Sequence, residues 1–221
     1  MTTTSYPRIG EKMHQAVLEN GLTIFMVPKS DFQKNFAFFA TKYGGMHTRF
    51  SLDDQTWIDS PAGVAHFLEH KLFDTEDGNA LQDLASNGAS PNAFTSSEIT
   101  GYYFESTEKF LENLKILLSF VSIPWFTKES VDKEQGIIAQ EICMVEDNPQ
   151  WRLYNNMLEG LYKNHPIRLS VAGTVESISH ITAETLYSCH KAFYNPANMV
   201  LVAAGNFDPE ELISLAQEVL P

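Results

Sequence analysis

One short segment constrains the fold of this 221-residue chain more than any other. The sequence His66-Phe67-Leu68-Glu69-His70 has apolar residues on both sides, which predicts a largely buried helix. On a helix, side chains four residues apart project from one face, so the two histidine rings would lie together. Buried polar groups need a partner, and a metal ion held by both imidazoles would supply one.

The order of these residues is the inverse of the H-E-x-x-H pattern of zinc hydrolases. Two imidazoles spaced in this way can hold one Zn²⁺ at ~2.0–2.1 Å. Glu69 would then lie where it can accept a proton from a metal-bound water. The alternative is a surface helix that carries two histidines by chance, and the apolar flanks of the segment argue against it. The sequence therefore predicts a zinc site with His66 and His70 as ligands.

A hydrolytic zinc site needs a third protein ligand and one open position. Glu134 and Glu141 lie seven residues apart on a helix expected from Thr127 to about Glu146, so they share one face. Spacing alone favours neither of them, and both remain candidates. Cys143 falls near the opposite face, where we expect a small buried residue.

Strand and helix signals alternate irregularly along the chain, which predicts an α+β fold with a mostly antiparallel sheet in a single domain, residues 1–221. Residues 18–24 suggest a hairpin with Asn20 and Gly21 at two positions of positive φ. Ser60 is expected to cap a helix that opens at Pro61 and runs to about residue 73. Further strands are expected within residues 35–43, 92–105 and 199–204, and further helices begin near Ser106, Thr127, Pro149, Thr182 and Asp208.

Composition excludes several classes of protein. With 15 Lys+Arg against 28 Asp+Glu the net charge is −13, which would repel nucleic acid and an anionic membrane surface. No apolar run approaches the ~18 residues of a membrane span, and the first twelve residues lack the apolar core of a signal peptide. The two cysteines give no disulfide framework, so we expect reduced thiols and a cytoplasmic location.

Six further groups of residues accompany the H-x-x-E-H segment: Asn87-Gly88 with Asn92–Thr95, Thr100–Tyr103, Glu134-x₆-Glu141, His165-Pro166, Ile181-Thr182 and Phe193–Met199. Each group is weak alone, but the combination is specific. In this combination the chain resembles the pitrilysin/insulinase/mitochondrial processing peptidase family of zinc metallopeptidases, over about residues 10–221.

The resemblance implies a role for each residue of the predicted site. His66, His70 and Glu141 would bind zinc, Glu69 would act as general base, and Glu134 would be a supporting carboxylate. The activity implied is zinc-dependent hydrolysis of peptides by an endopeptidase.

The resemblance also implies how a peptide substrate binds. Asn92, Ala93, Phe94 and Thr95 would form an edge strand that pairs with the extended substrate backbone. For Asn92, a part in a turn after Pro91 is an alternative of about equal weight.

Relatives of this kind carry two related halves that close like a clam shell around the substrate, and this chain resembles the metal-binding half. We expect it to be a fragment or to be completed by a second homologous half or partner chain, for example in a dimer. Alone it would bind zinc but cleave peptides poorly. The alternatives are a non-catalytic structural or assembly subunit of the same fold, and a zinc hydrolase of another substrate class.

Overall fold

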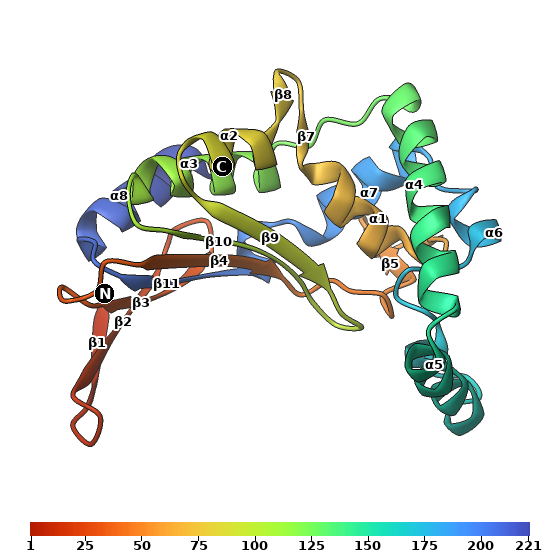
Figure 1. Cartoon of the computed structure of the whole chain (residues 1–221), viewed down its shortest axis with the longest axis horizontal. Coiled ribbons are helices and arrows are strands. Elements are labelled where there is room, and N and C mark those ends of the chain that lie inside the picture. The colour runs from red at the N-terminus through yellow and green to blue at the C-terminus, as the bar shows by residue number, and fades with distance from the viewer.

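The computed structural model describes all residues from Met1 to Pro221 and confirms the α+β fold. Seven strands form the main sheet in the order β1-β2-β3-β11-β4-β10-β9 (Figure 1). Only the β11–β3 pair is parallel. The strands are β1 (Thr2–Tyr6), β2 (Glu11–Val17), β3 (Thr23–Pro28), β4 (Asn35–Thr41), β9 (Ser90–Thr95), β10 (Thr100–Ser106) and β11 (Met199–Gly205).

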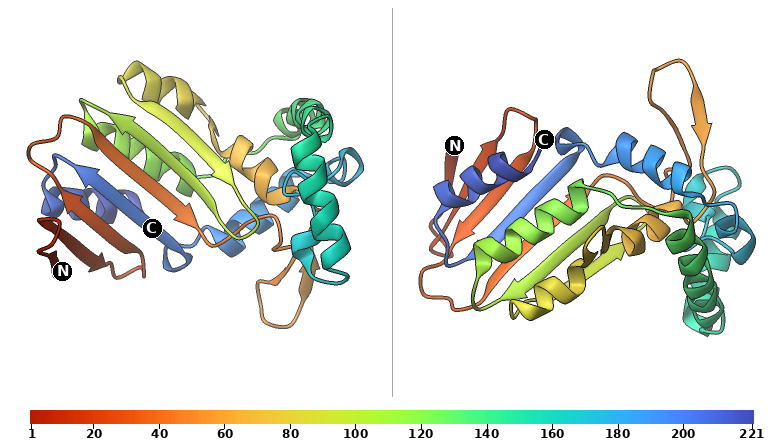
Figure 2. Two further views of the ribbon diagram at one scale, coloured as in Figure 1. Left: turned by 60° about the horizontal axis from the view of Figure 1, so that its bottom comes forward. Right: turned by 90° about the horizontal axis from the view of Figure 1, so that it is seen from above.

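Helices cover one face of this sheet and extend beyond one of its ends (Figure 2). Helices α2, α3 and α8 lie across the sheet, while α4, α5 and α6 gather beyond its end, beside α1 (Figure 1). None of the helices is both long and apolar enough to cross a membrane. The helices are α1 (Val64–Leu72), α2 (Ala80–Ser86), α3 (Phe110–Ser122), α4 (Lys128–Glu146), α5 (Pro149–Leu161), α6 (Val175–Ile178), α7 (Ala183–Phe193) and α8 (Pro209–Val219).

Buried and partly exposed side chains alternate along the central strands, which explains why the helices cover only one face of the sheet. On β4, Phe39 is fully buried, whereas Phe38 points to the opposite face and is partly exposed. On β3, Ile24 is fully buried and Phe25 is partly exposed in the same way. The core therefore lies between the sheet and its helices, and the second face of the sheet stays uncovered although it is apolar.

The helix that carries the H-x-x-E-H segment begins later than predicted. Its first residue is Val64, and the residue before it, Gly63, has φ 95° in the left-handed region, so the chain is not helical there. A Cβ on Gly63 would lie 2.6 Å from the carbonyl oxygen of Ala172, so only glycine fits this close approach. The predicted cap, Ser60, instead donates its N–H to the carbonyl of Thr48.

The predicted hairpin is present, but its turn differs. Strands β2 and β3 pair from Val17 and Thr23 outward, which leaves a five-residue loop rather than a two-residue turn. Only Gly21 has positive φ there, and the side chain of Asn20 accepts the N–H of Leu22. Strand β1 and the short hairpins β5 (Arg49–Ser51)–β6 (Trp57–Asp59) and β7 (Asp74–Thr75)–β8 (Gly78–Asn79) were not predicted.

Candidate metal centre

Two helices bring together three side chains that could hold a metal ion. His66 and His70 project from one face of α1, with ring centroids 4.6 Å apart, and Glu141 comes from α4. The Nε2 atom of His66 lies 3.6 Å from one oxygen of Glu141, and the Nε2 atom of His70 lies 3.5 Å from the other. One ligand atom can be chosen from each residue such that all three atoms lie within 4.8 Å of one another.

These distances fit a zinc ion. Two ligands at ~2.1 Å from a tetrahedral ion are ~3.4 Å apart, close to both observed separations. The donor set of two imidazoles and one carboxylate is also that of catalytic zinc sites. Ring nitrogens and carboxylate oxygens, which are all electron-rich, face one another here at partly buried positions. A cation between them would relieve their mutual repulsion.

Glu134 occupies a different position from Glu141, although spacing alone made them equivalent. Its Oε1 atom lies 3.0 Å from Nδ1 of His70. A carboxylate only accepts, so the Nδ1–H of His70 is the donor, and in the neutral ring the lone pair is on Nε2, toward Glu141. Glu134 therefore fixes the tautomer and ring orientation of His70, as supporting carboxylates do in metal sites.

Burial and charge act differently on the two histidines. Burial lowers the pKa of His66 to about 4, with a further contribution from the neighbouring His70, and its Nδ1 atom is buried without a partner. Burial also acts to lower the pKa of His70, but the hydrogen bond to Glu134 and the charges of Glu69, Glu134 and Glu141 outweigh it and raise that pKa. The cluster thus carries a surplus of negative charge, which suits a dication.

Glu69 lies beside this cluster and is only 8% exposed. Burial raises the pKa of its carboxyl group, and a hydrogen bond from Thr95 opposes that rise. The Thr95 hydroxyl donates to Oε2 of Glu69 at 2.7 Å. Sequence reasoning placed Thr95 only in the substrate-binding strand and missed this contact, because no sequence pattern reports that β9 packs against α1.

Strand β9 is the last strand of the sheet, so its outer edge is free of a neighbour. Asn92 lies within this strand, which makes its alternative assignment to a turn wrong. Ala93 and Thr95 face the helix layer, whereas Phe94 stacks on Phe38 on the uncovered face, at 6.0 Å between centroids. A cavity of about 400 Å³ borders both β9 and the cluster, lined among others by Asn92, Ala93, Glu69, His70 and Glu134.

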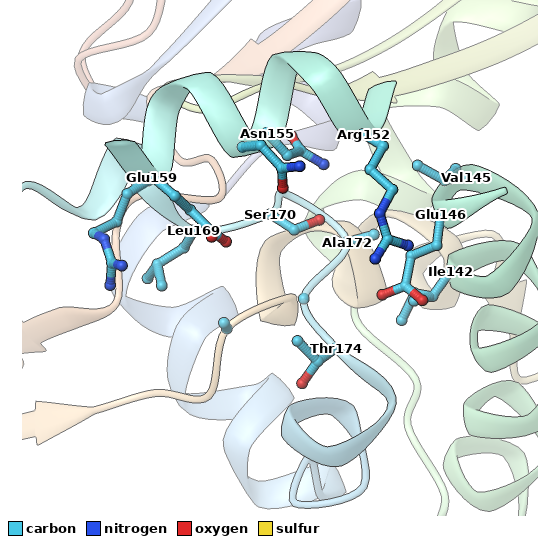
Figure 3. A pocket seen from close by; sticks show the side chains of 14 residues that line it. Ile142, Val145, Glu146, Arg152, Asn155, Glu159, Leu169, Ser170, Ala172 and Thr174 are labelled. Atoms are coloured by element: carbon cyan, nitrogen blue, oxygen red, sulfur yellow. The ribbon is translucent and has the colours of Figure 1, made fainter. Parts of the chain in front are cut away.

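A second cavity, of about 350 Å³, lies between the end of α4, helix α5 and residues 168–174 (Figure 3). The side chains of Arg152 and Glu146 point toward one another there (Figure 3). None of the clustered ligand side chains lines it. No motif drew attention to it, and it is separate from the candidate metal centre.

Comparison with known proteins agrees with this geometry. A family model described as insulinase (peptidase family M16) matches residues 58–175, and one described as peptidase M16 inactive domain matches residues 180–221. An uncharacterized zinc protease of Bacillus subtilis, YmfH, is 49% identical over 214 residues, covering 96% of this chain and 50% of that protein. The uncharacterized zinc protease ML0855 of Mycobacterium leprae is 36% identical over 162 residues, covering 71% of this chain and 36% of that protein.

Solved structures show the same half-length match. A putative M16-like peptidase from Alicyclobacillus acidocaldarius superposes with a TM-score of 0.91 at 40% identity, covering 98% of this chain and 50% of the other. A protease from Helicobacter pylori, at 21% identity and a TM-score of 0.83, shares the fold. The chain thus spans about half of the length of these relatives, or less. Its sequence and fold confirm the resemblance, and the chain belongs to the insulinase family of zinc proteases, peptidase family M16.

Proposed function

We propose that this chain is the metal-binding half of a zinc-dependent endopeptidase. The observation that carries the proposal is the convergence of His66, His70 and Glu141 at ligand distances, with the Glu69 carboxylate beside them. The relatives YmfH and ML0855 are named as zinc proteases, which supports zinc-dependent hydrolysis of peptides as the class of reaction. The intact set of ligands and base gives no support to the alternative of a structural subunit.

Each residue has a defined task in peptide hydrolysis. Zinc held by His66, His70 and Glu141 would polarise the scissile carbonyl and lower the pKa of water toward ~7. Glu69 accepts a proton from the attacking water and passes it to the leaving amine. Glu134 keeps the His70 ring oriented through its Nδ1–H.

The peptide would bind as an extended strand along the free edge of β9. Pro91 within β9 is compatible with an edge strand, where a missing N–H costs no ladder hydrogen bond. The cavity that borders Asn92, Ala93 and Glu69 would receive the residues around the scissile bond. Main-chain pairing of this kind recognises an extended peptide more than a particular sequence.

A second half would complete the enzyme, in line with relatives of about twice this length. The uncovered sheet face supports this, because strands such as β4 and β11 are apolar on both faces, as is typical of strands covered on both sides. Phe25, Phe38 and Val202 lie on that face and are partly exposed. We therefore expect weak peptide cleavage by the isolated chain and strong cleavage once the second half is joined to it.

Metal analysis and one matched variant test the function. Protein purified without chelator should contain one zinc per chain, and the full-length enzyme should cleave peptides in a chelator-sensitive way. Glu69→Gln should retain zinc, because the residue is not a ligand, yet lose nearly all cleavage. Full activity of Glu69→Gln would refute the role of the base, and a zinc-free, inactive wild-type protein would favour the structural class.

A further inference from the structure

One contact in the site that has no role so far joins Glu69, the proposed base, to a strand further along the chain. Glu69 on α1 receives its one hydrogen bond from the hydroxyl of Thr95, at 2.7 Å, across 26 residues of sequence. Its side chain is nearly buried, so this bond forms away from bulk water. A buried hydrogen bond to a charged group is among the stronger ones in proteins.

Thr95 is itself held rigidly at the end of β9. It pairs with Thr100 in the antiparallel register, and the Thr100 hydroxyl lies 3.5 Å from that of Thr95. Thr100 is fully buried and donates to the carbonyl of Tyr43 at 2.8 Å. The following turn is closed by the Ser96 N–H, which donates to the carbonyl of Ile99 at 2.8 Å. The hydroxyl that reaches Glu69 therefore starts from a fixed backbone position.

We propose that Thr95 is a positioning residue that holds the Glu69 carboxylate in its working orientation beside the cluster of His66, His70 and Glu141; this rests on the function proposed above. A glutamate side chain has three rotatable bonds, and holding it in one conformation costs entropy that a hydrogen bond offsets. A base that is misplaced by ~1 Å can lose about a hundredfold in rate. The carboxylate has no other hydrogen bond to hold it in place.

A purely structural role for Thr95 predicts a different result. In that case the hydroxyl would only satisfy a buried carboxylate, and its loss would lower stability without a specific effect on turnover. A role in substrate binding alone would raise KM. The positioning role instead lowers kcat while zinc content and KM remain, and a serine at the same position should restore it.

The test compares three variants of the full-length enzyme. Thr95→Val keeps the shape but removes the hydroxyl, Thr95→Ser keeps the hydroxyl, and Thr4→Val is a control at an exposed position of β1, at the opposite edge of the sheet. We expect Thr95→Val to lower kcat about tenfold to a hundredfold, with KM and zinc stoichiometry within twofold of wild type. Thr95→Ser should retain at least half of the wild-type kcat, and Thr4→Val should match wild type.

Crystals of the zinc-loaded chain supply a readout that does not depend on activity. In Thr95→Val the Glu69 carboxylate should leave its wild-type position, and in Thr95→Ser it should stay. An unchanged kcat and an unmoved Glu69 in Thr95→Val would overturn the positioning role. Wild-type enzyme without zinc-dependent cleavage would overturn the proposed function instead, and the position of Glu69 in the crystals would still decide the role of Thr95.

Discussion

The buried ring of His66 makes the metal-free chain sensitive to acid in a way that can be calculated. The side chain is 12% exposed and its pKa lies at about 4, against 6.5 for an unperturbed histidine. Between these values the unfolded chain binds a proton that the folded chain refuses, so stability falls as pH falls. At about 1.36 kcal/mol for each pKa unit, the loss from this one group is roughly 3 kcal/mol by pH 4.

The neighbouring His70 titrates in the opposite sense, so a single variant has to isolate the effect. Its pKa is raised, chiefly because the hydrogen bond to Glu134 and nearby carboxylates overcome burial. The stability it contributes is therefore present at low pH and lost as pH rises through its folded pKa. Measuring wild type alone would mix the two histidines with the protonation of many carboxylates.

Urea unfolding in the presence of a chelator, at pH 7 and at pH 4, gives the free energy of unfolding at each pH. The difference between wild type and a His66 variant gives the contribution of His66 to the loss of stability. His66→Asn removes the titrating ring, and His180→Asn serves as a control at an exposed position. Wild type and the control should lose roughly 3 kcal/mol more than His66→Asn between the two pH values. An equal loss in all three proteins would refute the reasoning, because it would mean that the folded chain can protonate His66 without cost.

Three further measurements follow from the same contacts. In a chelator competition, Glu134→Gln should weaken zinc binding by about 10–100-fold. Glu141→Gln should weaken it more, since only Glu141 faces both Nε2 atoms. The reverse order would contradict the ligand assignment. In urea unfolding, Phe39→Ala should cost about 3–5 kcal/mol, because the ring is fully buried, and Phe38→Ala on the uncovered face clearly less; equal costs would disprove the one-sided core. Leu153→Lys on α5, where the residue is 72% exposed, should change the free energy of unfolding by less than about 0.5 kcal/mol.

Local periodicity was enough to predict the part of the site that lies on one helix. Four-residue spacing places His66 and His70 on one face of α1 whatever the rest of the chain does. The third ligand was undecided, because Glu134 and Glu141 share a face of α4 and only the position of α4 against α1 distinguishes them. In the structure Glu134 reaches Nδ1 of His70, and Glu141 reaches Nε2 of both rings.

Errors in the sequence-based prediction have the same origin. Ser60 and Pro61 form a good local start signal, but the close approach of Gly63 to Ala172 keeps the chain from becoming helical until Val64. Cys143 was expected to be buried and is exposed, because only one side of α4 packs against the core. The order of the strands was also beyond local signals, since β11 from the end of the chain inserts between β3 and β4.

Strand β9 shows why two roles for one segment do not compete. An antiparallel edge strand offers its backbone N–H and C=O groups sideways, in the plane of the sheet, whereas its side chains point alternately above and below that plane. A peptide bound at the edge would use the backbone, and the Thr95 hydroxyl reaches Glu69 out of the plane. The register with β10 decides which residues face α1, because a shift by one position would direct Phe94 toward Glu69 and Thr95 away from it. The strand that would align the peptide would therefore also fix the base that acts on it, and this coupling depends on the pairing of Thr95 with Thr100.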